Sequence, residues 1–250
     1  MQVSCTIWVL EKKVEFKMEA AVDLHIHSAL SPCADDDMTP NNIVNMALLN
    51  GLDAIAVTDH NCCDNVEAVT KAAGNKLIVL PGMELQTLEE VHLLCYFQDL
   101  TSLYDFRNHM EQFYDGMANH PSYFGHQWIM NERDEVIGSK EQALLASLLL
   151  SFDDAVELIR KFKGLPVPAH INKPSNSILS QLGFIPPESG LTLLEISHNY
   201  PLDYRQYPNC TFLVSSDAHF LGQILERKML ISVEEITKEQ IFQFLSKSFI

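Results

Sequence analysis

The chain has 250 residues, of which 47% are hydrophobic and 20% are charged. This composition provides enough apolar material for one compact core, and it excludes intrinsic disorder, collagen and a long coiled coil. The 33 acidic residues outnumber the 17 basic residues, so the formal net charge is −16 with the histidines neutral. Because sequence-blind affinity for duplex nucleic acid comes mainly from cations placed against phosphates, we expect no duplex nucleic-acid partner.

The sequence also disfavours secretion and membrane association. The six cysteines show no Cys-x-x-Cys spacing, and a domain of this length needs no disulfide framework. The apolar run over residues 5–10 has no basic residue before it and is too short for a signal core or a membrane span. We therefore expect a reduced, cytoplasmic protein with no membrane partner.

Strands are the first elements that the chain predicts. The first twenty residues hold two apolar runs on either side of residues 11–13, which predicts a hairpin. Downstream, short apolar runs mix β-branched residues with leucine, as strands covered on both faces do. They predict seven strands, over residues 21–28, 52–60, 77–85, 91–97, 165–171, 192–197 and 211–219. A strand over residues 229–233 and a helix starting near Thr237 follow them.

Two helices between these strands are marked by their ends. Thr39 as N-cap, Pro40 in the first turn and Gly51 after the last turn bound a helix between the first two predicted strands. The capping box Asp64-x-x-Glu67 begins another before the third strand. Strands that alternate with helices predict a parallel α/β sheet or barrel. No linker or repeat interrupts the pattern, so we expect a single domain over residues 1–250.

The alternation stops between about residue 99 and residue 164. Helix start signals stand at Ser139-x-x-Gln142 and Ser151-x-x-Asp154, and Gly164 is a stop signal. This stretch predicts a helical insertion on the barrel.

Metal-binding residue types gather at the ends of the predicted strands. Because strand side chains alternate, Asp23, His25 and His27 share one face of the first strand, and two imidazoles at a strand end can chelate one metal. A single His-x-His pair is a weak signal, but ligand-type residues recur at or near later strand ends. These are Asp59, His60, Glu84, His92, His170, Asp217 and His219. Strand ends at one rim of an α/β barrel converge, which predicts a metal cluster there.

Six short motifs along the chain resemble those of one family, the PHP (polymerase and histidinol phosphatase) phosphoesterases. The resemblance covers residues 20–231, most of the chain. The motifs are Asp23-Leu-His-Ile-His-Ser28, Val57-Thr-Asp-His60, Gly82-Met-Glu84, Val91-His-Leu-Leu94, Pro168-Ala-His170 and Ser216-Asp-Ala-His219. The resemblance implies a distorted (β/α)7 barrel with two to three divalent metal ions at its rim.

The resemblance also implies which residues hold these ions. The first ion would be held by His25, His27, Glu84 and Asp217, the second by His60, His219 and a residue of the loop after the first motif, and the third by Glu84 as a bridge with His92 and His170. The family usually has Ser-Asp-Gly in that loop, five residues before a Thr-Pro helix start. Counting back from Pro40 here gives Asp35, with Asp36 and Asp37 as competitors. Imidazole with carboxylate suits Zn, Mn or Fe, and the lack of nearby Cys pairs argues against a soft thiolate site.

A phosphate substrate would need cations besides the metals. Lys173, three residues after His170, is the best placed, and Arg205 and Arg227 are further candidates. His198, after the sixth predicted strand, is a candidate to contact the substrate or to protonate the leaving group. The alternatives are a solvated surface charge for the arginines and a satisfied rim histidine for His198.

The resulting hypothesis is a metal-dependent phosphatase or phosphodiesterase. A hydroxide held by the metals would attack the phosphate ester in line, with Asp217 and His198 as the catalytic side chains. The substrate would be a small phosphorylated metabolite or a nucleotide. Two alternatives are an amidohydrolase-type metal hydrolase and a metal-binding regulatory module without turnover, because ligand retention and catalysis are separable.

Overall fold

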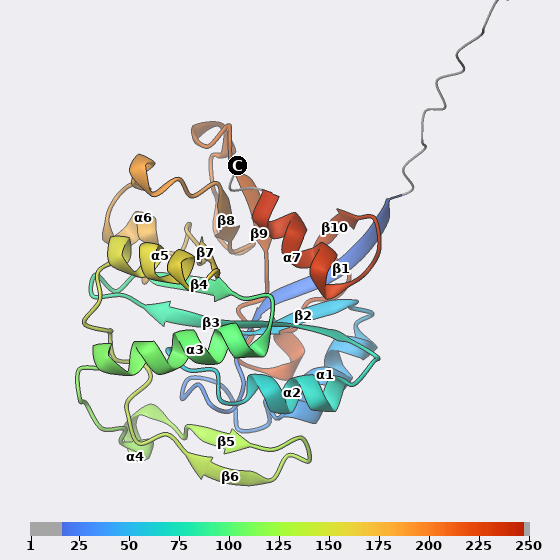
Figure 1. Ribbon diagram of the computed structural model, residues 1–250, viewed down its shortest axis with the longest axis vertical. Coiled ribbons are helices and arrows are strands. Elements are labelled where there is room, and N and C mark those ends of the chain that lie inside the picture. Colours follow the sequence, from blue (N-terminus) through green and yellow to red (C-terminus); the bar gives the residue numbers. More distant parts are fainter. Residues whose placement is uncertain (1–16, 248–250) are drawn as a thin grey trace, which may run out of the picture.

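The structure, a computed structural model, describes residues 17–247, and its centre is a strongly curled mixed sheet that forms a half-barrel (Figure 1). The predicted hairpin at the amino terminus falls mostly on residues 1–16, outside the described residues. The sheet has the order β10-β1-β2-β3-β4-β7, and β8 pairs separately with β9. Their bounds are β1 (Met18–Ile26), β2 (Ala54–Val57), β3 (Ile78–Gln86), β4 (His92–Tyr96), β7 (Leu165–Pro168), β8 (Leu193–Ile196), β9 (Thr211–Val214) and β10 (Leu230–Val233).

The two sheets meet at their edges. Beyond β7, the Ile171 N–H donates to the Glu195 carbonyl of β8 at 2.9 Å. On the other side, Ile26 of β1 forms a parallel bridge with Ala218, just after β9. All seven strands predicted for the barrel, and the later one at residues 230–233, are therefore present, and their arrangement is that of a curled half-barrel.

The expectation of a parallel sheet is wrong at β4. Strands β1, β2 and β3 are parallel, but β4 runs antiparallel to both β3 and β7. Only residues 87–91 separate β3 from β4, and a parallel crossover needs about a dozen residues. The reversal has a functional consequence: His92 at the start of β4 pairs in register with Gln86 at the end of β3, and so lies at the same rim as Glu84.

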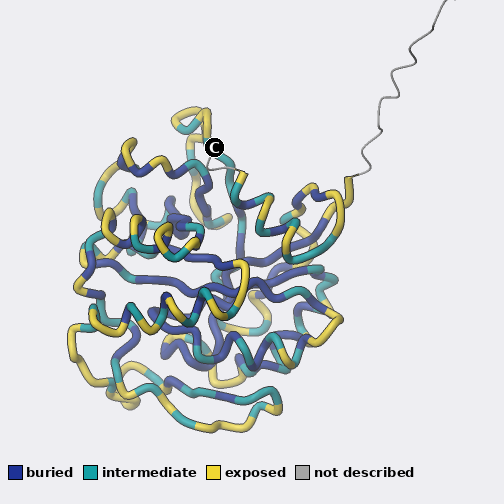
Figure 2. The backbone as a smooth tube through the Cα atoms, viewed as in Figure 1, coloured by how far each residue is buried: buried dark blue, intermediate teal, exposed yellow. Residues whose placement is uncertain are grey.

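Helices pack on both faces of the sheet. The amphipathic helix α5, for example, buries Phe152, Ala155, Val156 and Ile159, which recur at helical spacing. A second apolar core lies between the strands and α7, where Ile241 and Leu245 are fully buried. Buried strands inside and helices with exposed outer faces are apparent in Figure 2. The helices are α1 (Pro40–Leu49), α2 (Val66–Ala73), α3 (Leu100–Met110), α4 (Pro121–Phe124), α5 (Phe152–Lys161), α6 (Ile178–Gln181) and α7 (Lys238–Lys247).

Helix ends confirm one of the two predicted caps. The Thr39 side chain accepts from the Asn42 N–H, as expected for an N-cap of α1. The predicted capping box at Asp64 is wrong: α2 begins one residue later, with Asn65 as its N-cap. The Asp64 carboxylate instead pairs with Lys140 at 3.0 Å and with Arg107 at 3.2 Å. These long-range ion pairs, and not a helix cap, hold the Asp64 side chain.

The insertion between β4 and β7 is only partly helical, which corrects the prediction for residues 99–164. Helices α3 and α5 form as expected, and Ser151 caps α5 by accepting from the Asp154 N–H. Between them lies the antiparallel hairpin β5 (Trp128–Met130) and β6 (Val136–Ser139), so Ser139 ends a strand and begins no helix. Its turn depends on Asn131, whose side-chain oxygen accepts from two backbone N–H groups within the turn.

No helix in residues 17–247 is long and apolar enough to cross a membrane.

Candidate metal centre

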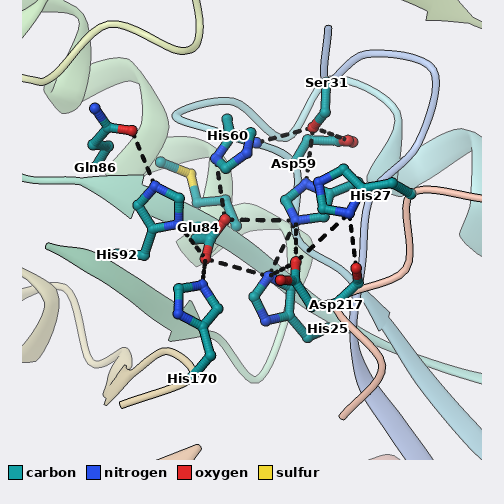
Figure 3. A network of polar contacts seen from close by, with 12 residues as sticks. His25, His27, Ser31, Asp59, His60, Glu84, Gln86, His92, His170 and Asp217 are labelled. Atoms are coloured by element: carbon teal, nitrogen blue, oxygen red, sulfur yellow. Dashed lines mark hydrogen bonds and ion pairs between the residues drawn. The ribbon is translucent and has the colours of Figure 1, made fainter. Parts of the chain in front are cut away.

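Five histidines converge with Glu84 and Asp217 at one rim of the half-barrel (Figure 3), and a sixth, His219, stacks on His27. Glu84, near the end of β3, is fully buried at the centre. Its oxygens lie 3.0 Å from His60 Nδ1, 3.0 Å from His92 Nδ1, 3.3 Å from His25 Nε2, 3.3 Å from His170 Nε2 and 3.5 Å from His27 Nε2. The structure thus brings together the residues that the sequence places at strand ends, around one carboxylate.

His25 in β1 and His27 just after it each donate from Nδ1 to an outer acceptor. His25 Nδ1 donates to the Glu195 carboxylate of β8 at 2.9 Å. His27 Nδ1 donates to the Ser31 hydroxyl at 3.1 Å, and that hydroxyl in turn donates to Asp59 at 2.7 Å. With Nδ1 carrying the proton, Nε2 of each ring faces the cluster with its lone pair.

Two more histidines of the cluster are oriented in the same way. His92 Nε2 donates to the Gln86 side-chain oxygen at 3.0 Å, which leaves Nδ1 facing Glu84. His219 Nδ1 donates to the Asp217 carbonyl at 2.8 Å. A histidine that donates one ring N–H to a fixed acceptor and presents the other nitrogen to a shared centre has the arrangement typical of metal ligands.

The donor atoms at the centre present lone pairs to one another, and a cation between them would satisfy these lone pairs. His25 Nε2 and His27 Nε2 are only 3.1 Å apart, and Asp217 Oδ1 lies 3.2 Å from the latter. Both Glu84 oxygens, both His170 ring nitrogens and Nδ1 of His92 are buried without a hydrogen-bond partner. Buried lone pairs that converge are unfavourable unless positive charge lies between them, so this donor set fits divalent ions.

The cluster shifts the pKa values of its own acids. Burial alone would raise the pKa of Asp217, but the adjacent His25 and His27 rings outweigh it and hold that pKa well below the usual range. Glu84 behaves likewise: burial opposes ionisation, and the surrounding imidazoles lower its pKa well below the ordinary value. Both carboxylates are therefore ionised at neutral pH and available as metal ligands.

A second group of donors lies toward the mouth of the cluster. Donor atoms of His27, Cys33, His60 and His219 all lie within 4.8 Å of one another. Cys33 is exposed, and the His219 side chain is 23% exposed, whereas His27 is fully buried. Although burial opposes its ionisation, contacts with His60 and His219 lower the pKa of the Cys33 thiol to about 6.

The loop ligand expected at Asp35 is not found in this group. The Asp35 carboxylate accepts from the Asp37 N–H, and only the backbone N–H of Asp35 reaches His219, by donating to its carbonyl at 2.9 Å. Asp36 pairs with His126 at 3.2 Å, and Asp37 is exposed. Successive turns in the loop face these carboxylates outward and bring Cys33 to the histidines.

Of the expected substrate-binding residues, Lys173 alone contacts the cluster. Its ammonium donates to Asp217 Oδ2 at 2.7 Å, and the side chain stays 28% exposed. His198 is exposed in the loop after β8. The guanidinium of Arg205, a 90% exposed side chain, binds its neighbour Asp203. Arg227 donates to the Gly51 carbonyl just before β2, at the opposite end of that strand from His60, so its placement does not support a role in the site.

The backbone is unusual at the rim. His170 has φ of 29°, Asp217 of 52° and Asn61, next to His60, of 49°. Residues other than glycine adopt this left-handed region rarely and at a cost. Strand ends that turn this sharply aim their side chains inward, where regular strand geometry would not.

Sequence patterns missed three contributors to the site. Glu195 is buried in β8 and accepts from His25 as well as from the His170 N–H at 2.9 Å, and the signal for it was an acid within an otherwise apolar strand. Ser31 and Cys33 stand in the loop after the His-x-His motif, where the sequence pattern favours the three aspartates as ligands. Asp59, expected to orient an imidazole, acts on His27 through Ser31.

Comparisons with solved structures show where this fold occurs. A lesion-specific endonuclease from Pyrococcus furiosus aligns with a TM-score of 0.70 and 20% identity, over 90% of this chain and 55% of that one. Endonuclease Q in complex with a 27-mer duplex substrate that has an abasic lesion aligns with a TM-score of 0.71 and 20% identity, over 92% and 57%. The chain thus spans little more than half the length of these endonucleases.

A third structure matches along nearly its whole length. A candidate metal-dependent phosphoesterase from Bifidobacterium adolescentis aligns with a TM-score of 0.59 and 16% identity, over 92% of this chain and 96% of that one. At such identities the likeness concerns the fold. No curated protein matches the sequence.

The family model of the PHP domain matches residues 23–166, more than half of the 250 residues and a stretch that includes His25, His27, His60, Glu84 and His92. The chain belongs to the PHP domain family of metal-dependent phosphoesterases.

Proposed function

We propose that this protein is a metal-dependent phosphoesterase that acts on a small phosphorylated metabolite or nucleotide at a di- or trinuclear centre. The observation that carries the proposal is the pair of His25 and His27 Nε2 atoms, 3.1 Å apart, which face the buried Glu84 carboxylate, whose two oxygens have no hydrogen-bond partner. We propose as metal-holding residues His25, His27, His60, Glu84, His92, His170, Asp217 and His219. The seven strands would then act as the distorted (β/α)7 barrel of the family, within one domain.

Divalent ions held by these residues would lower the pKa of bound water and balance charge on phosphoryl oxygens. The chain's own contribution begins with Glu84. Its Oε1 lies near His25, His92 and His170 and its Oε2 near His27 and His60, so the carboxylate could bridge two ions. Glu195, Ser31 and Gln86 fix the orientation of the histidine rings, so the site needs little reorganisation when substrate binds.

Lys173 is the proposed cation for the phosphate. Its ammonium is 2.7 Å from Asp217 Oδ2 and partly exposed, so it lies between the cluster and solvent. A lysine in this position can donate to a phosphoryl oxygen while it holds Asp217 in place. His198 remains a candidate to contact the leaving group from the loop after β8.

The test is metal-dependent phosphate release. The protein is stripped with a chelator, reloaded separately with Zn²⁺, Mn²⁺ or Fe²⁺, and assayed against nucleoside monophosphates and bisphosphates, histidinol phosphate and a set of amides. We expect phosphate release that requires metal and is absent from the double variant His25→Ala, His27→Ala. Hydrolysis of amides alone would indicate an amidohydrolase. Tight metal binding without any turnover would indicate a regulatory module, and either result contradicts the proposal.

A second candidate, cleavage of damaged DNA, is favoured by the structural likeness to endonuclease Q over about nine-tenths of this chain. The net charge of −16 argues against it, because duplex binding needs phosphate-facing cations. Nicking of a duplex that contains an abasic site, measured beside mononucleotide hydrolysis, separates the two functions.

A further inference from the structure

Cys33 is the loop residue that reaches the cluster. Its Sγ lies within 4.8 Å of donor atoms on His60 and His219, and of His27 behind them. His27 and Cys33 stand in the segment after β1, and His60 and His219 follow β2 and β9, so three separate parts of the chain converge on one point. Within this group, Cys33, His60 and His219 provide one thiol and two imidazoles for one ion, whereas Nε2 of His27 faces His25 and Asp217.

The neighbouring acids do not compete with Cys33. Asp35 accepts from the Asp37 N–H, and Asp36 pairs with His126. The Asp217 carboxylate has one oxygen toward His25 and His27 and the other toward Lys173, and its distance to His219 Nδ1 is 3.8 Å. Within the described residues, the thiol is therefore the donor from this loop that faces the two rim histidines.

Buried groups around the thiol also point to a ligand. His60 is 3% exposed, and its Nδ1 has no hydrogen-bond partner although Glu84 lies 3.0 Å away. His219 is held by its Nδ1 donating to a carbonyl, which leaves Nε2 for the cluster side, where its ring stacks on His27 at 4.4 Å. The Cys33 thiol and the rings of His60 and His219 therefore bring donor atoms together at a spacing that a cation between them would satisfy.

We propose that the Cys33 thiolate, with His60 and His219, binds the outermost metal ion of the centre, and that this position selects Zn²⁺ or Fe²⁺ over Mn²⁺ and Mg²⁺. The proposal rests on the proposed metal centre and names a ligand that the sequence pattern did not. On binding, the S–H proton is released to solvent and a sulfur–metal bond forms. Thiolate is a soft donor that Zn²⁺ and Fe²⁺ accept readily, whereas Mn²⁺ and Mg²⁺ prefer oxygen.

The other described cysteines provide controls within the same chain. Cys62, Cys63 and Cys95 are buried in the apolar core, and Cys210 is partly exposed in the loop before β9. None of these belongs to a group of metal-binding residues in the described part of the chain. Cys210→Ser therefore removes a thiol without touching the centre.

The test uses Co²⁺ as the probe, in the chelator-stripped full-length protein. Thiolate bound to Co²⁺ gives a charge-transfer absorption in the near ultraviolet that imidazole and carboxylate do not give. We expect this band in the unmodified protein and in Cys210→Ser, and its loss in Cys33→Ser and Cys33→Asp. A band that persists in both Cys33 variants, or that is absent from the unmodified protein loaded with Co²⁺, overturns the proposal.

Metal selectivity is the second measurement. Removal of a residue that merely orients a ligand lowers metal affinity by about 10- to 100-fold, so Cys33→Ser should weaken Zn²⁺ binding at one position by at least about 100-fold. Cys33→Asp should restore binding there but shift the preference toward Mn²⁺. Equal Zn²⁺ content and preference in all three proteins would overturn the proposal.

Failure of this inference is distinguishable from failure of the phosphoesterase assignment. Phosphate release without a Co²⁺–thiolate band would support the phosphoesterase assignment and overturn the proposal that Cys33 is a ligand. The band without phosphate release from any ester would establish Cys33 as a ligand and contradict the proposed reaction. Circular dichroism of each variant verifies the fold, which an exposed residue such as Cys33 should not disturb.

Discussion

The rim of the half-barrel and the insertion over residues 99–164 differ in how deeply their residues are buried and in what holds them in place. At the rim, short buried strands fix where each polar side chain emerges, and β2 is buried at every one of its positions. In the insertion, three of the four residues of β6 are exposed. The hairpin β5–β6 is held mainly by turns and by side-chain hydrogen bonds. Strong periodic burial gives readable sequence signals, whereas a polar, irregular segment does not.

The two regions nevertheless touch at a point that matters for the site. Gly125, at the end of α4, has φ of +98°, and a Cβ there would lie 2.1 Å from the Pro32 carbonyl. Pro32 precedes Cys33, so the insertion packs directly against the loop that holds the thiol at the cluster. The comparison therefore predicts large effects from changes at the rim and smaller ones from changes where the insertion meets it.

The largest effect is expected from Glu84→Gln. Because one carboxylate faces two groups of histidines, its loss should lower occupancy of at least two metal positions together and reduce turnover on the order of 1,000-fold. Metal content by mass spectrometry and phosphate release are the measurements, and Glu67→Gln on the surface of α2 is the control. Loss of a single ion would show that Glu84 does not bridge.

Glu195→Gln tests whether the rim depends on groups behind the ligands. The carboxylate accepts from His25 and from the His170 N–H, so the amide should weaken metal affinity by about 10- to 100-fold. Competition with a metal indicator gives the affinity. The exposed Glu188→Gln should behave like the unmodified protein, and an unchanged affinity in Glu195→Gln would reduce Glu195 to a packing residue.

Lys173→Ala should separate substrate binding from metal binding. We expect unchanged metal content and a drop in kcat/KM of about 10-fold, because one charge-assisted hydrogen bond to the phosphate is lost. A rise in KM with little change in kcat would mark a role in binding, and a fall in kcat would mark the hold on Asp217. If the variant loses metal, Lys173 is needed to keep Asp217 in place. Lys76→Ala, an exposed lysine, is the matched control.

The smallest effect, and the sharpest test of the contact between the regions, is expected from Gly125→Ala. Both Gly125 and Gly116 have positive φ, but a Cβ at Gly116 meets nothing within 4 Å. Gly116→Ala therefore carries the backbone strain alone, about 1–3 kcal/mol, and Gly125→Ala adds the clash with Pro32. We expect a lower Tm for Gly125→Ala than for Gly116→Ala, with weaker binding at the position of Cys33. Equal Tm values would show that the loop yields freely.

The strand ends could be predicted because burial and alternation leave few choices. His25, His27 and Glu84 stand at such places, and the structure brings them together around shared contacts. The prediction of Asp35 as a ligand counts residues back from Pro40 and so assumes a particular loop shape. The turns from Ser28 to Met38 give the loop a different shape. Distance along the chain carries no information on which side chain a turn faces inward.

Two further features lay beyond sequence patterns for a similar reason. Glu195 matters through a partner 170 positions away in the chain, and only the assembled sheet reveals that contact. The hairpin β5–β6 depends on Asn131 and on a register shift at Met130. The sequence of this segment instead contains a pattern typical of a helix start, at Ser139. Long-range pairing and turn conformation are properties of the folded chain.

The left-handed backbone at His170 and Asp217 has a consequence for how the site is assembled. Such conformations cost about 1–3 kcal/mol each and persist only where the surrounding structure holds them. The free energy that packing supplies elsewhere in the half-barrel therefore also maintains the backbone of two residues at the centre. A substitution that loosens the packing around these two turns should disturb the centre without removing any of its donor atoms.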